Sequence, residues 1–209
     1  MVAAVGLTAD LLSKHLAFQK LSWDQPLVVI PGVLRLQPSL NPGALFGLGV
    51  GLGPLFVVAS LLALVFVIYV FVRSAPQQRW LHVALGMVLA GALGNLYDRL
   101  FVLADVVWSG DDRVIFVGRA LPSQPGELRL ARYSQDGHVV TFRGPPTCTV
   151  RRQRVVRDFI KIETTIGGRE LWRWVFNVAD ALLVLGVALL MLSYRTARRT
   201  ARLASPPGR

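Results

Sequence analysis

The feature that most constrains this chain is an uncharged, predominantly apolar run of 18 residues, Leu55 to Val72. At about 1.5 Å per residue, a helix of this length spans about 27 Å, close to the thickness of the hydrocarbon core of a bilayer. A helix that is apolar on all sides is not stable on the surface of a soluble domain. The composition agrees, since 53% of the residues are hydrophobic and only 17% are charged. The sequence therefore predicts an integral membrane protein.

Three further segments can form membrane helices. Residues 81–96, continued by the apolar residues after Asp98 and Arg99, are one, and residues 174–194 are another, with Trp and Tyr at their borders. The first 18 residues are less apolar because they contain Asp10 and Lys14, but the i,i+4 spacing lets these two pair on one helix face. We expect an all-α membrane protein, a four-helix transmembrane bundle with small extracytoplasmic β elements.

The distribution of positive charge predicts the orientation of this bundle. The net charge is +11, and basic residues occupy the short loop 73–79 and the tail 195–209. Short basic loops face the cytoplasm, so we expect both termini there and no nucleic acid partner. The single cysteine, Cys148, and three scattered histidines have no metal-ligand spacing. We therefore expect no metal and no cofactor.

Two loops then face outward. The first contains a strand-like stretch, LVVIPGVLRL, predicted to form a cradle near residues 24–48. The second is long, and its residues 109–153 alternate apolar and polar side chains between Gly, Pro and Asp turns. This pattern predicts a small antiparallel β module. The expected organisation is three helices with the cradle in 1–104, an inserted module in 105–157, a catalytic loop and fourth helix in 158–194, and a cytoplasmic tail in 195–209.

Polar residues gather at the outward ends of the predicted helices. Asn95, Asp98 and Arg99 share one helix face, and Asn177 and Asp180 share another. Polar and charged side chains cost free energy within a membrane, so we expect each of them to have a structural or catalytic role.

Asp158, in the apolar frame VVRDFIKI, comes just before the last helix. Two carboxylates brought together in a low-dielectric site share a proton and can activate water. Alternatively, Asp158 caps a turn and Asp180 pairs with Arg99 or Lys14. Spacing alone leaves both interpretations open.

Five motifs in one order carry a resemblance to a known family. They are DLLSK at 10–14, NPGALFG at 41–47, G-x-x-x-N-L-x-D-R-L at 91–100, VRDFI at 156–160 and FNVAD at 176–180. Together they resemble the motifs of lipoprotein signal peptidase, also called signal peptidase II.

The resemblance implies a membrane aspartyl endopeptidase with Asp158 and Asp180 as its catalytic pair. It would remove signal peptides from diacylglyceryl-modified prolipoproteins by cleaving before the lipidated cysteine, at the outer face of the bacterial cytoplasmic membrane. The implied partners are these substrates and membrane lipids, and a monomer is expected. The residues implied to bind substrate or support the pair are Asn41, Gly43, Asn95, Asp98, Arg99, Asn177, Asp10 and Lys14.

One departure from the family pattern affects the assignment of Asp158. Asp98 and Asp158 lie 60 positions apart, so roughly fifty residues are interpreted as an insertion. Asp105 is the alternative catalytic residue, although it lacks the following Phe-Ile. Two other functions stay open: a transport or proton-relay protein that uses the intramembrane charges, and a scaffold that displays the β module.

Overall fold

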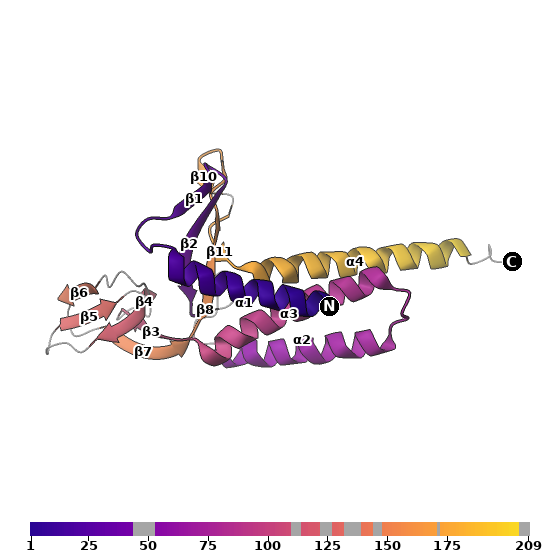
Figure 1. Ribbon diagram of the computed structural model, residues 1–209, viewed down its shortest axis with the longest axis horizontal. Coiled ribbons are helices and arrows are strands. Elements are labelled where there is room, and N and C mark those ends of the chain that lie inside the picture. The colour runs from indigo at the N-terminus through magenta and orange to yellow at the C-terminus, as the bar shows by residue number, and fades with distance from the viewer. Residues whose placement is uncertain are drawn as a thin grey trace.

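Four helices form an elongated bundle in the computed structural model, which describes residues 1–43, 53–109, 114–121, 127–131, 139–143, 148–170 and 172–204. They are α1 (Val2–Lys20), α2 (Gly53–Arg73), α3 (Arg79–Phe101) and α4 (Val178–Ala204). Helix α3 packs against each of the other three. The β-strands gather at one end of the bundle (Figure 1).

The helices form where the apolar runs predict them, and their outer surfaces are suited to lipid. By length and composition, α3 and residues Val178–Arg195 of α4 can cross a membrane, and Val57–Arg73 of α2 is a shorter apolar helix. Large apolar side chains of α2 and α4 are exposed, including Leu62, Val65, Val184 and Leu192. In water this surface would be unfavourable, whereas in lipid it is not.

The first sheet, which we call the cradle sheet, contains Asp158. Its strands are β1 (Leu27–Ile30), β2 (Leu34–Asn41), β8 (Val156–Ile162) and β11 (Val175–Phe176), in the order β1-β2-β8-β11. All neighbours are antiparallel, and Asp158 lies opposite Ser39. A short hairpin of β9 (Thr165–Ile166) and β10 (Arg169–Glu170) connects β8 to β11.

The expectation of a catalytic loop followed by a helix from residue 174 is therefore wrong in its details. Asp158 lies within a strand, Val175 and Phe176 are extended, and α4 begins only at Val178. The apolar run hid this boundary because Trp, Val and Phe suit a strand as well as a membrane helix.

The second sheet, which we call the module sheet, has five strands in the order β6-β5-β4-β3-β7. They are β3 (Leu103–Trp108), β4 (Val114–Leu121), β5 (Glu127–Ala131), β6 (Val139–Arg143) and β7 (Thr149–Arg154). The fold is thus not purely all-α, which corrects the predicted class: the helices carry most of the apolar residues, but in the described part of the chain the strands form the cradle sheet, the module sheet and the β9–β10 hairpin.

A shared apolar cluster joins the two sheets. Leu40 of the cradle sheet packs with Ala104 and Val106 of the module sheet and with Val155, and Phe18 and Trp23 cover them. Val102 alone separates α3 from β3, and Val155 alone separates β7 from β8. These short connections fix the end of α3 next to the strand that carries Asp158.

Close contact between α3 and α4 depends on Gly91. A methyl group there would meet the carbonyl oxygen of Ala179 and approach the Leu183 side chain to 2.7 Å. We expect Gly91→Ala to lower the free energy of unfolding by about 1–3 kcal/mol, as overpacking does. Thermal unfolding in detergent measures this. Gly86→Ala is the control, because its methyl would meet mainly the Val2 side chain at 3.0 Å, at the start of α1. An equal loss in both variants would contradict the prediction.

Candidate active site

The first turn of α4 holds Asp180 through a reciprocal cap. The Asp180 backbone N–H donates to Asn177 Oδ1 at 3.0 Å, and the Asn177 N–H donates to Asp180 Oδ2 at 3.2 Å. This is the geometry of a capping box, with an N-cap residue and an acid three positions later. A carboxylate is also favoured at a helix N-terminus by the helix dipole. The Phe-Asn-Val-Ala-Asp sequence therefore fixes Asp180 within the first turn of α4 by local hydrogen bonds.

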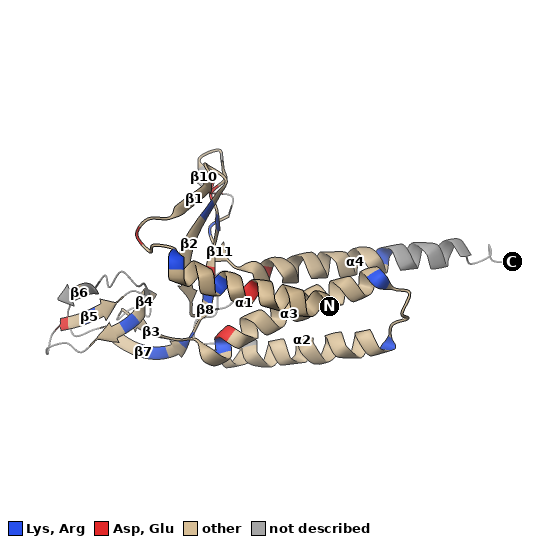
Figure 2. Cartoon of the chain, in the orientation of Figure 1, with Lys and Arg blue, Asp and Glu red and all other residues tan. Residues whose placement is uncertain are grey.

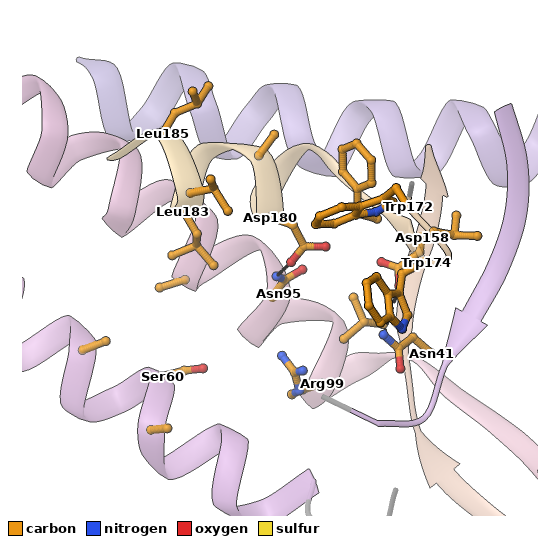
Figure 3. Close-up of a pocket in the computed structure, with 18 of the residues that line it drawn as sticks. Asn41, Ser60, Asn95, Arg99, Asp158, Trp172, Trp174, Asp180, Leu183 and Leu185 are labelled. Carbon is orange, nitrogen blue, oxygen red and sulfur yellow. Dashed lines mark hydrogen bonds between the residues drawn. The ribbon is translucent and has the colours of Figure 1, made fainter. Parts of the chain in front are cut away.

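Asn95, from α3, connects Asp180 to the rest of the site. Its Nδ2 donates to Asp180 Oδ1 at 2.8 Å (Figure 3), and its Oδ1 accepts from Asn177 Nδ2 at 3.1 Å. Lys14 Nζ donates to the same Oδ1 at 3.1 Å. Because the amide nitrogen and the amide oxygen of Asn95 both have partners outside α3, the orientation of the Asn95 side chain is fixed.

Lys14 lies at the centre of a fully buried charge cluster. Its ammonium group is 2.8 Å from Asp10 Oδ2 and 3.4 Å from Asp98 Oδ2, and all three side chains are 0% exposed. Asp10 Oδ1 also accepts the Ala179 backbone N–H at 2.8 Å, a second cap for α4. The cluster joins α1, α3 and α4, and the hydrogen bond from Lys14 connects it to Asn95.

Asp98 also positions the strand that carries Asp158. It accepts the Arg157 backbone N–H at 2.9 Å, and its Oδ1 pairs with the Arg157 side-chain nitrogens at 3.2 and 2.7 Å. Paired donors to one carboxylate impose a defined geometry. Since Arg157 precedes Asp158, this bridge fixes β8 against the end of α3.

Asp158 is almost completely buried, at 2% exposure. Asn177 Nδ2 donates to its Oδ1 at 2.7 Å, and Asn41 Nδ2 donates to its Oδ2 at 3.1 Å. The Gly43 N–H donates to Asn41 Oδ1 at 2.9 Å, which turns the amide nitrogen toward Asp158. Burial, together with the nearby negative charge of Asp180, raises the pKa of Asp158 to about 8. Asp158 is therefore mainly protonated at neutral pH.

Both carboxyl groups line one cavity of about 630 Å³, a size typical of ligand sites. Figure 3 shows Asp158 and Asp180 on facing sides of it, with Arg99 and Asn41 nearby. Most of the polar lining lies around the two aspartates, and the remaining lining side chains of α2, α3 and α4 are mostly small or aliphatic. The lining residues of those three helices are Ala59, Ser60, Ala63, Ala92, Asn95, Arg99, Asp180, Ala181, Leu183, Val184 and Leu185.

The predicted site residues fall into two groups. Asn41, Asn95 and Arg99 line the cavity with the two aspartates, whereas Asp10, Lys14 and Asp98 lie in the buried cluster. Asn177 is buried between the groups, and Gly43 supports Asn41. Residues 44–47 of the second motif lie outside the described residues.

Asp105 lies apart from this site. It belongs to β3 of the module sheet, where its Oδ2 accepts the Ala120 N–H at 2.8 Å. It is not among the residues that line the cavity. Within the described ranges, no group of three His, Cys, Asp or Glu side chains could hold a metal ion.

Sequence reasoning missed three residues of the site. Arg157 lies inside a quoted motif, but its role as the partner of Asp98 is a long-range contact that spacing does not reveal. Trp172 and Trp174 also line the cavity. Their alternation with Phe176 is the signal that could have identified an extended segment with one aromatic face.

Comparison with known proteins identifies the family. A sequence model of the family described as signal peptidase (SPase) II matches residues 2–196. The chain belongs to the signal peptidase II family. The resemblance carried by the five motifs is thereby confirmed, and the chain is a peptidase of the membrane.

Relatives from several bacteria agree with this family assignment. The lipoprotein signal peptidase of Clostridium novyi is 33% identical over 48% of this chain and 68% of its own length. That of Desulfitobacterium hafniense is 31% identical over 78% of this chain and 70% of its own. That of Rhodopirellula baltica is 28% identical over 91% of this chain and 68% of its own.

Solved structures support the fold of this signal peptidase II chain. Two structures of bacterial membrane enzymes match it, with TM-scores of 0.64 and 0.59. The first structure is 21% identical in sequence, and the match covers 100% of this chain and 92% of the matched chain. The second is 22% identical, and the match covers 92% of this chain and 89% of the matched chain. At this identity the likeness concerns the fold alone.

Proposed function

We propose that this chain is an aspartic endopeptidase that removes signal peptides from diacylglyceryl-modified prolipoproteins, cutting before the lipidated cysteine. Membership of the signal peptidase II family supports this reaction. The observation that supports the aspartic type is the convergence of Asp158 and Asp180 on one cavity, with Asn177 bonded to both.

The two carboxyl groups have different environments and so take different roles. Asp180 accepts two N–H donors in the first turn of α4, and we assign it the role of the base. Its carboxylate takes a proton from water, and the resulting hydroxyl attacks the carbonyl carbon of the peptide bond. Asp158, which carries a proton, transfers it to the carbonyl oxygen as charge develops there, so the tetrahedral intermediate is a neutral diol and Asp158 is left as a carboxylate.

The second half of the reaction reverses these transfers. Protonated Asp180 gives its proton to the leaving nitrogen as the carbon–nitrogen bond breaks. Asp158 then regains a proton from the tetrahedral intermediate, so the pair returns to its starting state. Arg99, whose side chain lines the cavity, is placed to bind a backbone carbonyl of the substrate.

The charge distribution supports a site at the outer face of the membrane. Figure 2 shows basic residues where α2 ends and α3 begins and again on α4, at the end of the bundle away from the sheets. By the positive-inside rule, that end and both termini are cytoplasmic. The acidic residues of the bundle lie toward the sheets instead (Figure 2), which disfavours a proton relay across the membrane.

Cleavage of a synthetic diacylglyceryl-modified lipoprotein precursor by the purified chain tests this function. We expect one cut, located by mass spectrometry immediately before the modified cysteine. The same precursor without the lipid is the control substrate and should be cut far more slowly. A chain that cuts neither precursor would contradict the proposal.

Activity should decline in alkaline solution because Asp158 must keep its proton. With its pKa raised to about 8, deprotonation above that pH leaves two carboxylates and no acid. We expect kcat/KM to fall through an apparent pKa near 8. The Asn41 hydrogen bond stabilises the carboxylate form, so Asn41→Ala should raise this pKa and move the alkaline limb to higher pH. A limb that stays in place, or moves to lower pH, would contradict the assignment to Asp158.

A further inference from the structure

Three aromatic residues form a row just before α4. Trp172, Trp174 and Phe176 occupy alternate positions, the last of them in β11, and their rings pack against one another. The Trp172 ring meets the Trp174 ring edge to face at 5.5 Å and the Phe176 ring at 6.2 Å. Edge-to-face pairs at such separations are favourable. We call these three residues the aromatic row.

The strand register places the aromatic row on the same face as Asp158. Phe176 lies directly opposite Ile160 in the cradle sheet, and directly opposite residues share a face. Asp158 is two residues before Ile160 and therefore lies on that face as well. All three aromatic residues line the cavity. In Figure 3, Trp172 lies near Asp180, and Trp174 lies between Asp158 and Asn41.

Lys161 holds this segment from the opposite face of β8. The side chain is buried, and its Nζ donates to the Trp172 carbonyl oxygen at 2.9 Å and to Glu170 Oε2 at 3.2 Å. Glu170 is 51% exposed, so the ion pair contributes little, and the carbonyl contact is the main anchor. A buried ammonium group is costly, and the proposed peptidase chemistry does not use this one.

The cavity has two chemically different parts, and Trp172 and Trp174 lie in the polar one, on the other side of Asp180 from Leu183 and Leu185 (Figure 3). One part presents the aspartates with Asn41, Asn95 and Arg99, and the other presents Ala59, Ala63, Leu183 and similar side chains of the membrane helices. An indole ring offers an apolar face and one N–H donor, which suits a group that is apolar at one end and polar at the other. Two acyl chains ester-linked to glycerol have this character.

We propose that Trp172 and Trp174 form a clamp that holds the glyceryl end of the substrate's lipid group beside the aspartates, and that Lys161 positions the clamp. The acyl chains extend along the apolar wall toward the bilayer. This inference rests on the proposed function, and it adds the residues that distinguish a lipidated precursor from an unmodified one.

Binding to the Asp180→Asn chain in nanodiscs tests the clamp without turnover. The probes are one labelled precursor peptide with a diacylglyceryl cysteine and the same peptide with a free cysteine, followed by fluorescence anisotropy. We expect Trp172→Leu and Trp174→Leu each to weaken binding of the lipidated peptide about tenfold, as loss of a buried aromatic contact does. Binding of the free-cysteine peptide should change less than twofold.

The positioning role of Lys161 has its own comparison. Lys161→Met should weaken binding of the lipidated peptide, whereas Lys161→Arg, which keeps a donor for the Trp172 carbonyl, should restore most of it. Trp80→Leu is the matched control, because Trp80 is 71% exposed and lies on the first turns of α3, at the basic end of the bundle. That variant should bind both peptides as the parent does.

The outcomes separate the clamp from the proposed function. Equal weakening for both peptides would mean that the row binds the polypeptide, and unchanged binding of the lipidated peptide would remove the clamp; either result overturns this inference alone. Failure of the unsubstituted chain to cleave the lipidated peptide would overturn the proposed function and the clamp together.

Discussion

Asp180→Asn and Asp158→Asn should each lower kcat for the lipidated precursor by about 10³–10⁴-fold, near the upper range for loss of a general acid or base. Asn cannot accept the proton of water at position 180, and it cannot return a proton at position 158. Both variants should fold, because an amide oxygen still accepts the bond from Asn95 at 180 and the bond from Asn177 or Asn41 at 158. Single-turnover cleavage, with unfolding temperature measured in parallel, checks both expectations.

Asp105→Asn is the matched control for these two variants. It makes the same chemical change in the module sheet, and an amide oxygen can still accept the Ala120 N–H. We expect activity within twofold of the parent chain. Loss of activity in Asp105→Asn with full activity in Asp158→Asn would transfer the catalytic role to Asp105 and refute the assignment made here.

Lys14→Met should cause the largest loss of stability among the single substitutions considered. It removes the ammonium group between the Asp10 and Asp98 carboxylates, all of them 0% exposed. Breaking a buried ion pair from one side costs about 3–5 kcal/mol, because the remaining charge stays buried without compensation. Activity should fall with stability, since Lys14 also bonds Asn95. Thermal unfolding in detergent measures the first effect, and cleavage measures the second.

Two companion variants define the origin of this loss. Lys20→Met changes an exposed lysine at the end of α1 and should have little effect. The double variant Lys14→Met with Asp10→Asn should regain part of the stability, because one uncompensated carboxylate is gone while the amide oxygen can still accept the Ala179 N–H. Additive losses in the double variant would refute the proposed coupling.

The sequence predicted the parts of this molecule that depend on local pattern. Apolar runs located the helices, because a membrane span needs length and little charge. The i,i+3 spacing correctly placed Asn95 and Asp98 together on α3 and brought Asn177 next to Asp180, although Asn177 caps α4 and does not lie within it. These rules need no knowledge of distant contacts.

Features that depend on long-range pairing escaped prediction. The Asp98–Arg157 bridge and the pairing of Ser39 with Asp158 join residues far apart in the chain. The register of the module sheet could not be predicted either, since the alternation of apolar and polar residues predicts strands but not which strands pair. The role of Asp158 likewise stayed open because residues 102–157 separate it from α3 in the chain, whereas the hydrogen bond from the Val155 N–H to the Val102 carbonyl oxygen brings the two back together in space.

The two caps of α4 have a consequence for how the molecule matures. The backbone of its first turn is bonded to Asn177, to Asp180 itself and to Asp10 of the first helix. During synthesis from the N-terminus, α1 enters the membrane long before α4 exists. The carboxylate of Asp180 reaches its working position only when the last helix docks against the first. A partly made chain therefore carries no assembled pair of carboxyl groups, and under the proposed mechanism it cleaves no peptide until α4 has docked.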